Sequence, residues 1–239
     1  MERTTALRGI AANGSRLTPE ELARKATELE LPLADLYVLA GRQVPDGLLP
    51  PERDAEVARE FGYRASLCDH GALAELEEFV RGLPRLAAPG PFTQSGIGHD
   101  RPYGPGFATV FAGLMRNRGF GIRSLPFVGL SRSTLVQMVR NYEDEGMKPH
   151  HEYQLCAVAG VLGWTLRDLF AVAGDPFEER LRPVILCRHL GRVFVAATHL
   201  TTDQLVQALG EADRLSGRRY QGVWRGVSEG DVEGCPDYR

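Results

Sequence analysis

The spacing of apolar residues is alike in two parts of the chain. Residues 22–41 read LARKATELELPLADLYVLAG, and residues 155–174 read LCAVAGVLGWTLRDLFAVAG. In both, apolar residues recur every three or four positions, which is typical of one face of an α-helix. The identical pairs are Leu22/Leu155, Ala26/Ala159, Leu29/Leu162, Leu33/Leu166, Asp35/Asp168, Leu36/Leu169, Ala40/Ala173 and Gly41/Gly174. Eight matches among twenty positions, all with an offset of 133 residues, indicate an internal duplication.

Each copy is predicted to form two short helices. Pro32 suits the first turn of a new helix, and the matching Thr165 suits an N-cap. Gly41 and Gly174 then end the second helix of each copy, because glycine tolerates the left-handed conformation of a C-terminal cap.

The duplicated aspartates, Asp35 and Asp168, fall in the first turn of the second helix in each copy. A negative charge at that position interacts favourably with the helix dipole.

Three further helices are predicted in front of the second copy. Residues 107–117 are amphipathic, and residues 122–128 form a shorter apolar stretch. Gly129 permits a tight turn, after which Ser131 can cap a helix over residues 132–141. The polar face of this last helix carries arginine, serine and glutamine, which are side chains able to hydrogen-bond to base edges in the DNA major groove.

The charge distribution supports contact with a polyanion at the same place. Residues 101–142 contain six arginines, Arg101, Arg116, Arg118, Arg123, Arg132 and Arg140, and no Asp or Glu. The whole chain carries −3, so the rest must carry −9. A basic stretch within an acidic chain is expected to attract nucleic acid if it folds onto one face. The alternative is a solvated arginine surface paired with acidic neighbours.

These features together resemble the five-helix DNA-binding domain of the XRE (Cro/C1-type) helix-turn-helix transcriptional regulators, of the actinobacterial type. The segment IRSLPFVGLSRSTLVQMVRN matches the helix-turn-helix, MKP the following loop, and LCAVAGVLGWTLRDLF the last two helices. The resemblance implies base reading by Arg132, Ser133 and Gln137. It also implies backbone contacts by Arg123, Ser131, Thr134 and Arg140.

The chain departs from the family pattern at three places. Pro126 stands where alanine is usual, and Ile122 stands where the family often has a glutamine that binds phosphate. The loop over residues 142–146 is long and acidic, so it must point away from DNA if DNA is bound. If Glu143–Glu145 instead lay beside the recognition helix, the protein would be an interaction module on a helix-turn-helix scaffold.

The first copy is incomplete, since residues 1–41 match only the third to fifth helices of such a domain. A half-domain cannot bury its own apolar face. We therefore expect it to dock on residues 52–83, on the second domain or on another protomer.

The sequence as a whole predicts five regions, with a mainly α fold and a small α+β C-terminal lobe. The expected regions are a partial repeat (1–45), a helical segment (46–83), a Pro/Gly-rich linker (84–105), the helix-turn-helix domain (106–176) and a C-terminal lobe with a flexible tail (177–239). Helices are expected at 52–62, 71–82 and 203–215. Residues 184–187 and 193–197 look like strands of a hairpin that turns at Leu190-Gly191. Phe194, Tyr220 and Trp224 are candidate residues for an effector pocket.

The sequence does not indicate membrane insertion, a disulfide framework, a zinc site or a catalytic site. No apolar stretch approaches the ~18 residues of a transmembrane helix, and the N-terminus lacks a secretory signal. The four cysteines are scattered, so reduced thiols in a cytoplasm are expected. The Cys-x-His pairs at 68–70 and 187–189 lack the usual paired spacing of a zinc site, and no catalytic fingerprint occurs. The sequence thus predicts a cytoplasmic regulator that binds double-stranded DNA as a homodimer, with no cofactor, metal or enzymatic activity.

Overall fold

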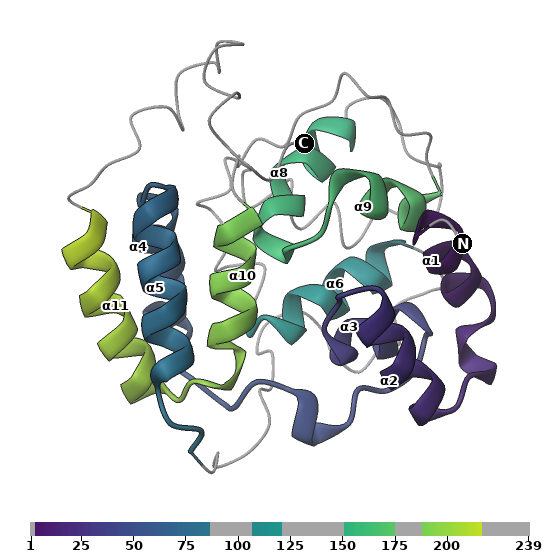
Figure 1. The fold of residues 1–239 in the computed structure, drawn as a ribbon, viewed down its shortest axis with the longest axis horizontal. Coiled ribbons are helices and arrows are strands. Elements are labelled where there is room, and N and C mark those ends of the chain that lie inside the picture. Colours follow the sequence, from purple (N-terminus) through teal and green to yellow (C-terminus); the bar gives the residue numbers. More distant parts are fainter. Residues whose placement is uncertain (1–2, 87–106, 121–150, 175–187, 217–239) are drawn as a thin grey trace.

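The computed structural model describes residues 3–86, 107–120, 151–174 and 188–216, and these are mainly helical (Figure 1). The helices are α1 (Arg3–Asn13), α2 (Pro19–Glu28), α3 (Leu33–Leu39), α4 (Ala55–Ser66), α5 (His70–Gly82), α6 (Phe107–Asn117), α8 (His151–Leu162), α9 (Leu166–Ala173), α10 (Arg188–Ala196) and α11 (Thr202–Ser216). Short 3-10 turns are η1 (Gly14–Arg16), η2 (Asp46–Leu48) and η5 (Ala197–His199). Within these ranges there is no β-strand, and no helix combines the length and apolar character needed to cross a bilayer.

The two copies of the repeat have the same secondary structure. Each consists of two short helices, α2 and α3 in the first copy and α8 and α9 in the second. Thr165 caps α9 as predicted, because its hydroxyl accepts a hydrogen bond from the amide of Asp168 at 3.0 Å. Gly41 and Gly174 have φ values of +63° and +83°, the left-handed conformation that glycine adopts without strain.

The first copy docks on the helices of the second domain, residues 106–176, within the same chain. Helix α1 packs against α9, and α3 packs against α6 (Figure 1). The apolar residues that face this interior include Leu7 and Ile10 of α1 and Leu36 of α3, all at most 2% exposed. The incomplete repeat thus buries its apolar face against the helices of the second domain, which is one of the three docking partners expected.

The other helices form a bundle beside the paired repeats. Helix α11 packs on α4 and α5, and α10 packs on α5 and on α8 of the second repeat (Figure 1). The bundle therefore joins residues 55–82 with residues 188–216, which are far apart in the sequence. Helix α10 connects the bundle to the repeats.

The predicted β-hairpin is wrong over the residues that the structure describes. Residues 188–196 form helix α10, so Leu190 and Gly191 lie inside a helix instead of at a turn. Leu190, Val193 and Phe194 are buried with Ala197, and this spacing of three and four residues is helical. The β-branched run was misleading because burial of this face outweighs intrinsic strand propensity. Residues 184–187, the other predicted strand, lie outside the described residues.

Glycine makes the contact between α10 and α8 possible. A Cβ atom placed on Gly191 would lie 2.3 Å from the carbonyl oxygen of Gly160 and 2.3 Å from the Cα of Gly163. Real side chains do not approach a backbone so closely, so only glycine fits at residue 191 with this packing. The residue predicted to turn a hairpin instead lets two helix backbones come together.

Candidate functional site

The residues predicted to read DNA lie in a part of the chain that the structure does not describe. These are Arg123, Ser131, Arg132, Ser133, Thr134, Gln137 and Arg140, all within residues 121–150. The acidic loop at 143–145 falls in the same range. What the structure describes is the scaffold on either side of this range, namely α6 before it and α8 and α9 after it.

A buried carboxylate holds this scaffold to the first repeat. Asp35 of α3 is fully buried, and its two oxygens accept hydrogen bonds from Arg118 at 2.6 and 2.7 Å. They also accept from the indole Nε1 of Trp164 and from the side-chain amide of Asn117, each at 2.9 Å. A buried charge is tolerated only when it is paired and hydrogen-bonded, and Asp35 meets both conditions. This network ties α3 to the C-terminal ends of α6 and α8.

Arg118 is consequently unavailable to a polyanion. Its side chain is 1% exposed and pairs with Asp35, and its guanidinium also donates to the carbonyl of Leu162 at 2.5 Å. The basic stretch recognised in the sequence thus loses one of its six arginines to the protein interior. Arg116, two residues earlier in the last turn of α6, is exposed.

The second repeat has a matching contact. Asp168 of α9, the counterpart of Asp35, is also buried, and it accepts a hydrogen bond from Arg3 Nε at 2.7 Å. The same arginine donates to the carbonyl of Leu29. Because Leu29 and Leu162 are equivalent positions, each arginine joins the aspartate of one repeat to the leucine carbonyl of the other.

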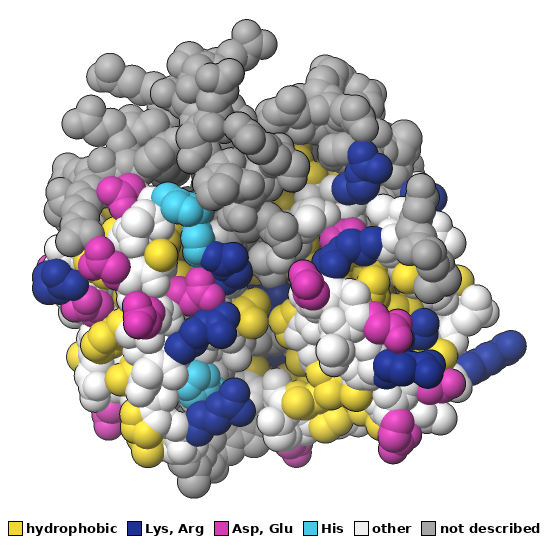
Figure 2. All heavy atoms as spheres, in the orientation of Figure 1, with side chains coloured by type: hydrophobic (Ala, Val, Ile, Leu, Met, Phe, Trp, Pro, Cys, Tyr) yellow, Lys and Arg dark blue, Asp and Glu magenta, His cyan; other side chains and the backbone are white. Residues whose placement is uncertain are grey.

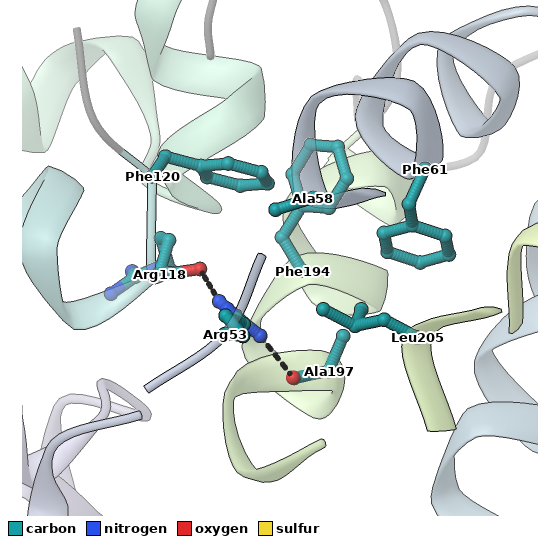
Figure 3. Close-up of a pocket in the computed structure, with 8 residues that line it drawn as sticks. All are labelled: Arg53, Ala58, Phe61, Arg118, Phe120, Phe194, Ala197 and Leu205. Atoms are coloured by element: carbon teal, nitrogen blue, oxygen red, sulfur yellow. Dashed lines mark hydrogen bonds between the residues drawn. The ribbon is translucent and has the colours of Figure 1, made fainter. Parts of the chain in front are cut away.

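A second buried arginine connects the paired repeats to the bundle. Arg53 donates to the carbonyls of Ala197 and Arg118, the former at 3.0 Å (Figure 3). Both of these acceptors are main-chain carbonyls, and Arg53 Nε has no hydrogen-bond partner among the described residues. Burial lowers the pKa of Arg53 to about 10, since desolvation disfavours the charged form.

The hollow around Arg53 does not form a ligand site as it stands. It is lined by Arg53, Ala58, Phe61, Arg118, Phe120, Phe194, Ala197 and Leu205 (Figure 3). The space between these side chains is too narrow to admit a water molecule. Phe194 therefore lines a closed apolar contact, in which its ring meets Phe120 edge to face at 4.8 Å. Tyr220 and Trp224, the other residues suggested for an effector pocket, lie outside the described residues.

Sequence reasoning missed both buried arginines. The identity of Asp35 and Asp168 between the copies was a signal, but it was interpreted through the helix dipole alone. Arg118 was counted as surface charge. Arg53 lay in a predicted helical segment, where no feature of the sequence indicated that it is buried. Their partners are 65 to 144 residues away in the chain.

In the described ranges no cluster of three or more His, Cys, Asp or Glu side chains could hold a metal ion. Two histidines, His70 and His189, do meet between α5 and α10.

Comparisons with protein-family models, with curated proteins and with solved structures found no match.

Proposed function

We propose that the protein is a sequence-specific DNA-binding transcriptional regulator that reads the major groove with residues 131–141. The observation that supports the proposal is the place of that segment in the order of the chain, between two helices that the structure describes. Residues 121–150 leave from α6 and return to α8, and both helices belong to the paired repeats. Thirty residues are enough for two short helices, a turn and a loop. The order of helices before and after them agrees with the resemblance to XRE-type domains.

The chemistry of the segment supports the same function. Arg132 can bind guanine with two hydrogen bonds, Gln137 can bind adenine, and Ser133 can bind either. Arg123, Ser131, Thr134 and Arg140 are assigned to the phosphate backbone, where they set the position of the helix in the groove. Residues 121–142 contain no acidic side chain, and the proposal requires the acidic residues Glu143–Glu145 that follow to point away from the duplex.

Binding as a homodimer, with half-sites about one helical turn apart, belongs to the proposal. The docked first repeat restricts how two chains can associate. The faces of α9 and α6 that receive α1 and α3 are already covered within one chain. A second chain would therefore bind through other surfaces.

One observation favours the second candidate, a protein-interaction module on the same scaffold. Because Asp35 neutralises Arg118 in the interior, the basic stretch is weaker on the surface than the sequence indicates. Such a module would show no affinity for DNA of its own.

The double variant R132A/Q137A tests the assignment of the reading residues. Loss of two base contacts, each worth about 1–3 kcal/mol, should reduce the preference for a selected sequence over a scrambled one by ~10-fold or more. The matched control is R24A/Q207A, which removes an exposed arginine from α2 and an exposed glutamine from α11. Binding is measured by fluorescence anisotropy, and circular dichroism checks the fold. Unchanged preference in R132A/Q137A would overturn the assignment.

A further inference from the structure

The turn at the end of α6 leads directly into the proposed DNA-reading segment. Helix α6 ends at Asn117, and Gly119 adopts the left-handed conformation with a φ of +65°. The amide of Phe120 donates back to the carbonyl of Met115 at 3.1 Å, which closes the turn against the end of the helix. Residues 118–120 are the last described residues before residue 121, so this turn sets where the chain leaves α6.

Arg53 holds this turn through its main chain. One Nη atom of Arg53 donates to the carbonyl of Arg118, and the other donates to the carbonyl of Ala197 at 3.0 Å (Figure 3). The guanidinium lies directly against Gly119, where a Cβ atom would be 1.7 Å from Nη2 of Arg53. Any side chain at residue 119 would therefore displace the arginine.

Arg53 is buried, and no described residue supplies a carboxylate to pair with it. On the surface of the bundle, by contrast, basic and acidic side chains are interspersed (Figure 2), and Arg81 there pairs with Glu77. The two acceptors of Arg53 directly follow α6 and α10, so each carbonyl lies at the negative end of a helix dipole. Two helix ends thus supply the partial negative charge that a buried cation needs, and Arg53 joins them.

An aromatic contact links the same turn to the bundle. The ring of Phe120 meets Phe194 of α10 edge to face with 4.8 Å between centroids, and Phe194 meets Phe61 of α4 in the same way at 6.1 Å (Figure 3). All three rings are at most 2% exposed. Helices α4 and α10 therefore hold the turn through the side chain of Phe120, while Arg53 holds it through the backbone.

We propose that Arg53 and Phe194 are positioning residues, which set how the bundle presents the DNA-reading segment. The inference rests on the proposed function, because it assigns to both residues an effect on DNA binding. Neither side chain contacts DNA, since they are 7% and 1% exposed. They act through Arg118 and Phe120. The side chain of Arg118 is also held by Asp35, so the first repeat and the bundle meet at one residue beside the segment.

The experiment measures the affinity of the full-length chain, by fluorescence anisotropy, for a duplex enriched from random sequence. R53M removes the hydrogen-bond donors and should weaken binding by ~2- to 30-fold, the range expected for residues that act on a site through packed neighbours. R53K keeps a cation that can donate to both carbonyls, and it should restore most of the affinity. The salt dependence of binding should not change in R53M, because a buried arginine releases no counterion.

Two further variants separate positioning from stability. F194L keeps an apolar side chain but loses the edge-to-face contact with Phe120, so it should weaken binding even if R53M fails to fold. L73A is the control, because Leu73 is buried one turn after His70, which contacts the start of α10, whereas Ala197 follows its end. Binding is measured where circular dichroism shows every variant to be folded, and L73A should bind like the wild type.

Hydrogen–deuterium exchange of the DNA-free chain distinguishes failure of this inference from failure of the proposed function. Amides of Gly119, Phe120 and the residues that follow should exchange faster in R53M than in L73A. If the wild type selects no duplex, the proposed function fails, and equal exchange in R53M and L73A would overturn the positioning role as well. If the wild type does bind, equal affinity in R53M, F194L and L73A would overturn it.

Discussion

Asp35 and Asp168 occupy equivalent positions 133 residues apart, and each binds an arginine that also donates to the main chain of the other repeat. Asp35 binds Arg118, which reaches the carbonyl of Leu162, and Asp168 binds Arg3, which reaches the carbonyl of Leu29. The duplication therefore brings together two reciprocal contacts that join the repeats. The two contacts differ in burial, since Arg118 is 1% exposed and Arg3 is 33% exposed.

Replacing Asp35 by Asn should destabilise the protein strongly. The variant leaves the buried guanidinium of Arg118 without a counter-charge, which costs about 3–5 kcal/mol in the free energy of unfolding. Urea denaturation measures the loss. D213N is the matched control, because Asp213 is 61% exposed in its pair with Arg64 and such pairs contribute at most about 1 kcal/mol. Equal losses in D35N and D213N would contradict the role given to Asp35.

Replacing Asp168 by Asn should cost less than replacing Asp35. Arg3 is partly exposed, so it can recover hydration when its partner is neutralised, and we expect a loss of about 1–3 kcal/mol. The same denaturation experiment ranks the two variants. A larger loss for D168N than for D35N would show that burial of the arginine does not decide the cost.

Replacing Gly191 by Ala should separate α10 from α8. The new methyl group would collide with the backbone of Gly160 and Gly163, and we expect destabilisation of about 1–3 kcal/mol. Gly210 in α11 is the control, since nothing lies within 4 Å of a Cβ at that position. G210A should raise stability by up to about 1 kcal/mol, because alanine favours helices more than glycine does. Thermal melts distinguish the two, and stabilisation by G191A would refute the close packing.

Cys68 should make stability depend on pH above 9. Burial raises the pKa of its thiol from 9.0 to about 11. Between these values the unfolded chain loses the thiol proton while the folded chain keeps it. The contribution of the neutral thiol is therefore complete below pH 9 and is lost as pH rises toward 11. The difference in unfolding free energy between the wild type and C68A, measured in urea at pH 7.5 and 10.5, should shrink at the higher pH. A constant difference would contradict the raised pKa.

The sequence predicted the helices best where their apolar faces have regular spacing. The predicted helices at 107–117 and 203–215 correspond to α6 and α11, and both copies of the repeat formed their two helices. Helix α10 was missed because Val193-Phe194-Val195 has strand-like composition. Its helical spacing became evident only once Leu190 and Ala197 were seen to share the buried face.

The contacts between distant segments could not be predicted from one sequence. Nothing in the chain indicates that Arg118 pairs with Asp35 or that His70 meets His189, because these partners are set by the packing of whole helices. The candidate DNA-reading residues were derived from a motif, and residues 121–150 lie outside the described ranges. Their roles remain predictions.

Binding of the full-length chain to random-sequence duplex DNA, measured over a range of salt concentrations and followed by selection of bound sequences, tests the proposed function most directly. Release of counterions at Arg123 and Arg140 alone predicts that the logarithm of the binding constant falls with the logarithm of salt concentration, with a slope of about −2 per chain. Selection should also enrich one sequence motif. Absence of binding at low salt would contradict the proposal and would favour an interaction module on the same scaffold.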